Sequence, residues 1–254
     1  MNKNKIFINC LIFLFLLFCM LFLFRLNNSN STGCSPLNDI EVNNKLKMIH
    51  ENLKIKYGTF DEELPEQKMV VKYLTGKEKV LEIGSNIGRN SLIIGYILGK
   101  KNQSKFVTLE CNTEIVKQIT ENMLLNNMNF HIENSALSKK KLIQKGWDTI
   151  ESDTVLDGYT EVKTITLDDL HKKYKIRFDT LILDCESCFY NILKDMPDIL
   201  KNIKLVIMEN DYHDIHKKEY VDNILKKHNF YVDYTEAGGW GVCSKNFFEV
   251  WKKK

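Results

Sequence analysis

The sequence has too few cysteines, at spacings too irregular, to build a disulfide framework. Five of its seven cysteines follow the apolar N-terminal run, an odd number, at positions 34, 111, 185, 188 and 243. Cys185 and Cys188 have the spacing of a redox pair, but the acidic residues beside them disfavour the thiolate that such a pair needs. A zinc site that joins them to His213 and His216 is the alternative, although the spacing of the two histidines is shorter than usual. We therefore expect no disulfide scaffold.

The sequence also lacks a basic segment with interleaved aromatic residues, an internal repeat and a second domain boundary. Lysine and arginine number 36 against 33 aspartate and glutamate residues, a net charge of +3 with the two signs interleaved. The lysine runs at 139–141 and 252–254 fit solvated ends better than a nucleic-acid surface. We therefore expect one domain and no nucleic-acid partner.

One long hydrophobic run is present, at residues 6–24. At about 1.5 Å per residue, a helix of this length just crosses a hydrocarbon core of about 30 Å. Lys3 and Lys5 precede the run and Arg25 follows it, so the positive-inside rule places the N-terminus in the cytoplasm. A cleaved signal peptide is the alternative, but the run exceeds the usual length of about 7 to 15 residues and no A-x-A-like site follows. The sequence predicts an uncleaved single-pass membrane anchor at residues 1–26, with the remaining chain lumenal or extracellular.

A polar stalk at residues 27–36 separates this anchor from a domain at 37–254, which is long enough for one α/β core. Within the domain, two helices are followed by apolar segments of strand length that alternate with segments of helical spacing. Such alternation predicts a mainly parallel sheet with helices on both faces. The expected helices span 41–56, 65–74, 90–98, 113–126, 187–194 and 216–227, and the expected strands span 79–83, 105–109, 129–133, 180–183, 204–208, 230–234 and 247–251.

The segment at residues 80–88, Val-Leu-Glu-Ile-Gly-Ser-Asn-Ile-Gly, predicts a buried strand that ends in a glycine loop. Gly84 lets a ligand approach the backbone, Gly88 allows a helix to pack closely on the strand, and the helix start presents free N–H donors. The spacing is G-x-x-x-G, which differs from the G-x-G-x-x-G that binds a dinucleotide pyrophosphate. The loop therefore favours a nucleotide-sized ligand without a pyrophosphate, such as S-adenosylmethionine.

The predicted strands of the central series end in an acid or a polar pair. Ligands bind at the carboxyl ends of the strands in such a sheet, so these side chains are candidates for the site. They are Glu82, Glu110, Asn134 with Ser135, Asp184 with Glu186, and Glu209 with Asn210 and Asp211. Each of them alone fits a helix cap or a solvated turn, but their recurrence at one edge of the sheet indicates a site.

Four segments resemble the FkbM family of class I S-adenosylmethionine-dependent methyltransferases. They are residues 81–88, 109–112 with 134–138, 162–170, and 183–187 continuing to 193–194 and 206–209. The most specific part is Leu-Asp-Asp-Leu at 167–170 followed by a strand that ends in Asp-x-Glu. Glu82 stands where the family often has aspartate, and Ser187 stands where a glycine usually follows the acid. The segments at 236–241 and 247–251 resemble forms met in large DNA viruses.

The resemblance implies a Rossmann-like class I methyltransferase fold that binds S-adenosylmethionine at the strand ends. Glu110 is placed to accept hydrogen bonds from the ribose diol. Gly84 and Gly88 would flank the methionine and ribose portion, with help from the Glu82 carboxylate. The implied cofactor-binding residues are Glu82, Gly84, Asn86 and Gly88 of the loop, Glu110, and Ser135 and Ala136 beside the adenine.

Methyl transfer to a hydroxyl is an in-line displacement at a sulfonium, so the enzyme supplies alignment and a base for the hydroxyl proton. The candidate catalytic residues are Asp184, Glu186, Glu209 and His213. Asp184, Glu209 and Asn210 also offer the oxygen ligands that suit Mg²⁺. Because Cys185 and Ser187 interrupt the acids without adding a hard ligand, we favour a metal-free base.

The residues and the resemblance together predict a membrane-anchored O-methyltransferase that acts on a hydroxyl of a glycan sugar or another small-molecule acceptor. FkbM-type enzymes commonly modify hydroxyls of sugars and natural products, and a lumenal domain suits work on glycans. Two alternatives stay open. One is a nicotinamide-dependent oxidoreductase, which the glycine spacing disfavours. The other is an anchored, methyltransferase-like binding module without activity.

Overall fold

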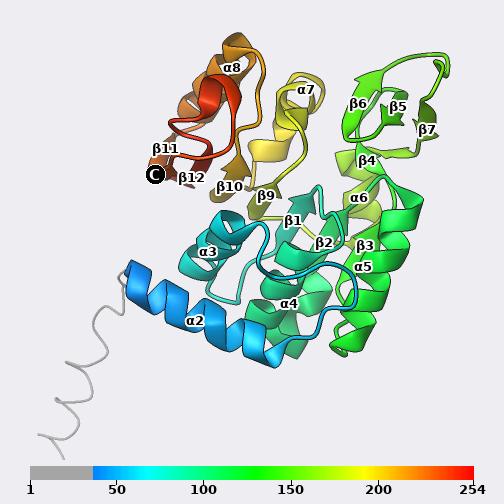
Figure 1. The fold of residues 1–254 in the computed structure, drawn as a ribbon. Coiled ribbons are helices and arrows are strands. Elements are labelled where there is room, and N and C mark those ends of the chain that lie inside the picture. The colour runs from blue at the N-terminus through cyan, green and yellow to red at the C-terminus, as the bar shows by residue number, and fades with distance from the viewer. Residues whose placement is uncertain (1–36) are drawn as a thin grey trace, which may run out of the picture. The chain divides into compact units, whose positions relative to one another are not determined.

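A mixed seven-stranded sheet organises the chain (Figure 1). The computed structural model describes residues 37–254, which form one unit, Leu37–Lys254. The predicted anchor and stalk, residues 1–26 and 27–36, lie outside the described residues. Within 37–254, none of the helices combines the length and the apolar character that a membrane crossing requires.

The sheet has the order β11-β12-β10-β9-β1-β2-β3. β1 pairs in parallel with β2 and β9, and the parallel pairing continues to β3 on one side and to β10 on the other. β12 lies between β10 and β11 and is antiparallel to both. The bounds are β1 Val80–Ile83, β2 Phe106–Leu109, β3 His131–Glu133, β9 Thr180–Leu183, β10 Leu205–Glu209, β11 Phe230–Glu236 and β12 Phe248–Lys253. The order of the parallel strands is that of a doubly wound, Rossmann-like sheet, so the predicted α/β fold class is confirmed.

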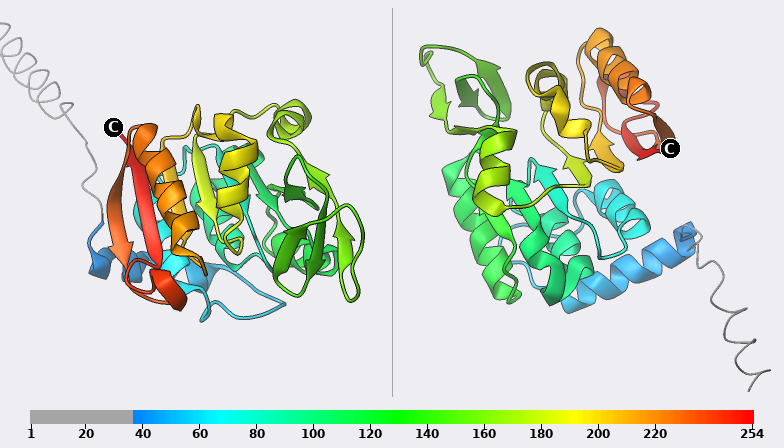
Figure 2. Two further views of the ribbon diagram at one scale, coloured as in Figure 1. Left: turned by 90° about the horizontal axis from the view of Figure 1, so that it is seen from above. Right: turned by 180° about the vertical axis from the view of Figure 1, so that it is seen from behind.

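Helices cover both faces of this sheet, with α3 and α4 on one side and α7 and α8 on the other (Figures 1 and 2). Four helices begin after a side chain that accepts backbone N–H groups: Asn38 before α2, Asn112 before α5, Thr166 before α6 and Asp214 before α8. The bounds are α2 Asp39–Asn52, α3 Leu64–Tyr73, α4 Arg89–Asn102, α5 Thr113–Leu125, α6 Leu167–Tyr174, α7 Cys188–Asp195 and α8 Ile215–Lys227. Short 3-10 helices span η1 Gln103–Lys105, η2 Pro197–Leu200 and η3 Gly241–Cys243.

The central strands are buried on both faces, as expected for parallel strands between two helical layers. All residues of β1 and β9 are buried, and their apolar side chains belong to one core that extends from α2 to β12. The predicted helices and strands of the large sheet are confirmed, with bounds shifted by a few residues.

The segment between β3 and α6, for which the sequence analysis predicts no element, folds into two small sheets. β4 pairs with β8, and β5 pairs with both β6 and β7. The bounds are β4 Ala136–Leu137, β5 Leu142–Lys145, β6 Asp148–Glu151, β7 Thr160–Val162 and β8 Thr164–Ile165. β6 is exposed along its whole length, so no apolar alternation marks it in the sequence. In Figures 1 and 2 the β5-β6-β7 sheet, in green, stands at the opposite side of the domain from β11 and β12.

Candidate active site

A cavity of about 340 Å³ opens at the carboxyl ends of β1, β2 and β9. Gly84, Glu110 and Asp184 line it, and each of them directly follows one of these strands. Further lining comes from β5 and β6 and from α7. The cavity therefore lies where ligands bind in doubly wound sheets.

Gly84 begins the loop after β1 with a φ of +85°, a conformation in which residues with a side chain are strained. A Cβ atom at this position would lie 1.6 Å from the carbonyl oxygen of Asp184. The Gly84 N–H donates to the carbonyl of Leu109 at 3.1 Å. The glycine is therefore required for close packing of the loop against the backbone that follows β9, a constraint that the sequence analysis assigned to the ligand alone.

Asn86 and Gly88 differ in their relation to the cavity. Asn86 lines it, whereas Gly88 does not. Gly88 precedes α4 with a φ of +90°, and a Cβ atom there would lie 2.6 Å from the Ile119 side chain of α5. Gly88 thus permits close packing as predicted, but its partner is a helix and not a strand.

Glu110 presents its carboxylate to the glycine loop. Its two oxygens accept the N–H of Asn86 at 3.1 Å and the N–H of Asn112 at 2.8 Å. Burial raises the pKa of the Glu110 carboxyl, and these backbone donors act against that rise. The carboxylate is held at the cavity wall with lone pairs left for the hydroxyls of a ribose.

Ser135 and Ala136 line the cavity beyond the end of β3. The Ser135 hydroxyl is buried and has no hydrogen-bond partner among residues 37–254. Buried polar groups in folded proteins are nearly always partnered, so this hydroxyl is a group that a bound molecule would satisfy. Both residues therefore lie in the wall of the cavity in which the cofactor is expected to bind.

Glu82 does not line the cavity. Its side chain is 1% exposed and accepts a hydrogen bond from the Ser91 hydroxyl of α4. Burial raises the pKa of the Glu82 carboxyl to about 7, and the hydrogen bond from Ser91 acts against this rise. The direct contact with a cofactor that the resemblance implies is not available from this position, because the carboxyl is turned into the core between β1 and α4.

Acidic side chains gather at the ends of β9 and β10. Carboxylate oxygens of Glu66, Asp184 and Glu209 lie within 4.8 Å of one another. Glu66 belongs to α3, is 9% exposed, and its Oε2 has no hydrogen-bond partner in the described part of the chain. Burial, together with the neighbouring carboxylates, raises the pKa of both Asp184 and Glu209. Such a cluster can hold protons at neutral pH, and its oxygens also suit a divalent cation.

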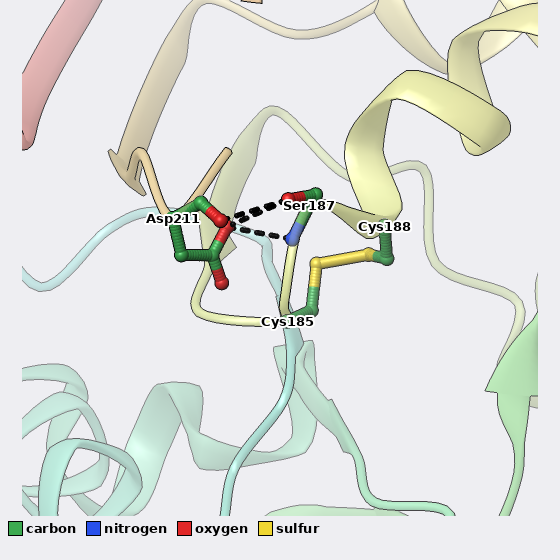
Figure 3. The surroundings of a disulfide bond; sticks show 4 residues. All are labelled: Cys185, Ser187, Cys188 and Asp211. Atoms are coloured by element: carbon green, nitrogen blue, oxygen red, sulfur yellow. Dashed lines mark hydrogen bonds between the residues drawn. A yellow bond between two sulfur atoms is a disulfide. The ribbon is translucent and has the colours of Figure 1, made fainter. Parts of the chain in front are cut away.

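Glu186 lies in the loop between β9 and α7, two residues after Asp184, and lines the cavity. The Glu186 residue is exposed at the surface, but partial desolvation of its carboxyl, with the nearby Asp211 carboxylate, raises its pKa to about 7. A carboxyl with such a pKa is suited to accept a proton near neutral pH. Asp211 accepts the Ser187 N–H at 2.6 Å, and the Ser187 hydroxyl donates to the Asp211 carbonyl oxygen at 3.0 Å (Figure 3).

Cys185 and Cys188 are joined by a disulfide, so they form the bonded pair that their spacing suggests and that the acidic neighbours were expected to disfavour (Figure 3). The chain between β9 and α7 turns so that the two Cα atoms lie 5.4 Å apart, within the range of bonded cysteines. Because a cysteine binds zinc as a free thiolate, the two bonded cysteines do not form the zinc site with His213 and His216. Both cysteines line the cavity.

His213 stands apart from the other candidate catalytic residues. It is exposed, its ring packs at a tilt against that of Trp240 with 4.3 Å between the ring centroids, and it does not line the cavity. Asp184 and Glu186 line the cavity, and Glu209 meets Asp184 in the acidic cluster. The structure therefore brings three of the four predicted residues to one place.

Two parts of the site were missed by the sequence analysis. Glu66 lies in the first turn of α3, where an acid is an ordinary helix-start residue and gives no signal of a site. The cavity lining from β5 and β6 lies in a segment without a family motif or an apolar pattern. It comprises Leu142 and Gln144 of β5, Trp147 of the turn that follows, and Thr149 and Glu151 of β6.

Comparisons with known proteins give likeness at the level of the fold. No protein-family model matches the sequence, and no curated protein matches it. The chain is similar to an O-methyltransferase from Bacillus cereus in complex with SAH, with 13% identity, 91% of this chain and 97% of that chain covered, and a TM-score of 0.44. It is also similar to a ribosomal protein L11 methylase from Lactobacillus delbrueckii subsp. bulgaricus, with 12% identity, coverage of 79% and 82%, and a TM-score of 0.47. A tRNA m1G37 methyltransferase from M. jannaschii matches with 11% identity, coverage of 78% and 51%, and a TM-score of 0.45.

Proposed function

We propose that this chain is an S-adenosylmethionine-dependent O-methyltransferase of the FkbM type. The carrying observation is the cavity at the strand ends, where two backbone N–H groups hold the Glu110 carboxylate beside the glycine loop. A carboxylate held in this way suits a ribose diol. The unpartnered Ser135 hydroxyl can donate to an adenine nitrogen, so the residues present fit the cofactor.

S-adenosylmethionine supplies an activated methyl group on a sulfonium sulfur. The protein aligns an acceptor hydroxyl with this methyl group and accepts the hydroxyl proton. Glu186 is the best placed of the predicted bases, because it lines the cavity and its pKa is raised to about 7. Burial, together with the surrounding acids, raises the pKa of Asp184 well above the ordinary range, so it holds a proton more readily than it accepts one.

The proposed acceptor is a hydroxyl of a glycan sugar, and the proposed location is a membrane, with residues 6–24 as the anchor and the domain on the lumenal or extracellular side. The support for both is the resemblance to FkbM-type enzymes, including forms of large DNA viruses, and the hydrophobic run. The disulfide between Cys185 and Cys188 agrees with this location, because disulfides persist mainly in oxidising compartments.

Calorimetry with S-adenosylhomocysteine tests the cofactor assignment. Glu110→Ala should weaken binding by about 1.5 to 3 kcal/mol, the range for a hydrogen bond to a charged group. Glu114→Ala is the matched control, because Glu114 is an exposed acid of α5 that pairs with Lys117 and does not line the cavity, so its loss should leave the affinity unchanged. Equal affinities for the two variants would refute the assignment.

The same titrations separate the alternatives. Binding of NAD in place of S-adenosylhomocysteine would indicate an oxidoreductase, and binding of neither would indicate an inactive module. Incubation with labelled S-adenosylmethionine and a panel of glycans then tests the acceptor class. Label that appears in RNA or DNA included as a competitor, and not in glycans, would contradict the glycan proposal.

A further inference from the structure

The loop between β9 and α7 places a disulfide in the lining of the cavity. Cys185 and Cys188 are both partly exposed and both line the cavity. The bond joins residues only three positions apart in the sequence. Closing so short a loop removes little entropy from the unfolded chain, so the consequence of this disulfide is local rather than a large gain in overall stability.

The backbone between the two cysteines has an uncommon conformation. Glu186 and Ser187 have φ values of +52° and +63°, in the left-handed region that residues with a side chain rarely occupy. Three sets of contacts hold this conformation, one of which is the hydrogen bond from the Cys188 N–H to the Cys185 carbonyl oxygen at 3.0 Å. The disulfide joins its ends, and Asp211 accepts the Ser187 N–H and carries the carbonyl to which the Ser187 hydroxyl donates (Figure 3). Without the disulfide, only hydrogen bonds among these contacts remain, namely those to Asp211 and the one between Cys188 and Cys185.

We propose that the Cys185–Cys188 disulfide is a thiol–disulfide exchange site, at which a dithiol that enters the cavity releases the loop carrying Glu186. The Glu110 carboxylate accepts the N–H groups of Asn86 and Asn112, neither of which belongs to the loop between β9 and α7. Reduction should therefore change the acceptor side of the cavity and leave the cofactor side in place. The assignment of an acceptor side and a cofactor side to the cavity rests on the proposed function, whereas the exchange reaction does not.

The exchange is a two-step displacement. A thiolate of the dithiol attacks the sulfur of Cys185, the S–S bond breaks, and its electron pair leaves on the sulfur of Cys188, which takes up a proton. Cys188 is the first residue of α7, and the positive end of the helix dipole favours negative charge on the leaving sulfur. The second thiol of the reagent then attacks the reagent sulfur that is bonded to Cys185. This breaks the mixed disulfide and releases the sulfur of Cys185, which is protonated. Two electrons and two protons pass from the dithiol to the pair, and the reagent becomes a disulfide.

The test uses the full-length protein in detergent with dithiothreitol as the probe. Alkylation followed by peptide mass spectrometry reports the state of Cys185 and Cys188, and amide hydrogen exchange reports the loop. On reduction, the amides of residues 186–188 should exchange about tenfold faster or more, because the loop opens locally. The affinity for S-adenosylhomocysteine should change by less than about threefold, since Glu110 and Ser135, which are proposed to bind it, lie outside this loop.

Two variants and one ligand sharpen the test. Cys185→Ser with Cys188→Ser should show the fast exchange without reductant and no further response, and reduced wild-type protein gives the same readout if this variant does not fold. Cys243→Ala is the control that should keep the response, because its thiol is free and buried away from the cavity. Bound S-adenosylhomocysteine should slow the reduction, because the disulfide lines the cavity that the ligand would fill.

Three results would overturn the proposal. They are free thiols at both positions in untreated protein, a disulfide that dithiothreitol does not reduce in folded protein, and loop exchange that is unchanged after reduction. A protein that binds no S-adenosylhomocysteine but still shows the exchange response would contradict the cofactor assignment and leave the exchange site standing.

Discussion

The buried carboxyl of Glu82 should make the domain less stable as the pH rises toward neutrality. Burial raises its pKa from an ordinary value of 4.5 to about 7. Between these two values the folded protein retains a proton that the unfolded chain releases. Folding stability therefore falls as the pH rises through this window, and the full cost is present above the folded-state value. This direction is opposite to that of a carboxylate stabilised by an ion pair, whose contribution is lost in acid.

The magnitude follows from the same two values. Each tenfold change in proton affinity corresponds to about 1.4 kcal/mol, so a pKa raised from 4.5 to about 7 destabilises the fully ionised state by about 3 kcal/mol. A glutamine has the shape of the protonated acid and carries no charge. Its amide oxygen can still accept the hydrogen bond from the Ser91 hydroxyl.

Urea unfolding of residues 37–254 at about pH 5 and about pH 8 provides the assay. Relative to wild type, Glu82→Gln should gain about 2 to 3 kcal/mol of unfolding free energy between these two conditions. Glu114→Gln, at an exposed position, is the control that should track wild type. A difference between Glu82→Gln and wild type that is the same at both pH values would refute the reasoning. Retained affinity of the variant for S-adenosylhomocysteine would agree with a position outside the cavity lining.

Other expectations concern the loop, the base and the anchor. Gly84→Ala should lower the unfolding temperature by many degrees, because its Cβ would lie 1.6 Å from the Asp184 carbonyl oxygen, and a variant that melts like wild type would contradict the packing described. Glu186→Gln should lower kcat by about 10²- to 10⁴-fold with cofactor affinity kept, and EDTA should have no effect on turnover. Turnover that is lost with EDTA and restored by Mg²⁺ alone, with Asn210→Ala as harmful as Asp184→Ala, would instead establish metal assistance. Deleting residues 1–26 should yield a soluble, active domain, and the full chain should resist carbonate extraction from membranes, whereas a shortened soluble form in cells would show a cleaved signal peptide.

The central sheet could be predicted because its determinants are local. β1 and β9 are short apolar segments that are buried on both faces, and the helices between the strands show a 3.6-residue period. Glu110 could be singled out for the same reason, since a polar residue directly after a parallel strand lies at the ligand edge whatever else the chain does. The small β5-β6-β7 sheet could not, because its strands are short, partly exposed and paired only with each other.

The rest of the site depends on distances between segments that are far apart in the sequence. Glu66 reaches the acidic cluster only because α3 packs near the end of β10, and no property of its own helix records that placement. The disulfide could not be predicted from the acidity of the two thiols, because it depends on the 5.4 Å between the Cα atoms of Cys185 and Cys188. The sequence predicted only part of the role of Gly84. The atom that excludes a side chain there is the carbonyl oxygen of Asp184, which follows β9 and lies one hundred positions away in the sequence.

The position of β12 has a consequence for the order in which the sheet can be completed. β12 follows β11 in the chain, yet it lies between β10 and β11 and supplies the hydrogen-bonded partner of both. During synthesis, β11 therefore emerges without a neighbour to pair with, and β10 keeps an open edge until residues 248–253 have been made. Exposed strand edges of this kind favour association with other chains. A nascent chain of this protein would pass through an aggregation-prone stage that ends only when a late strand is inserted into the sheet.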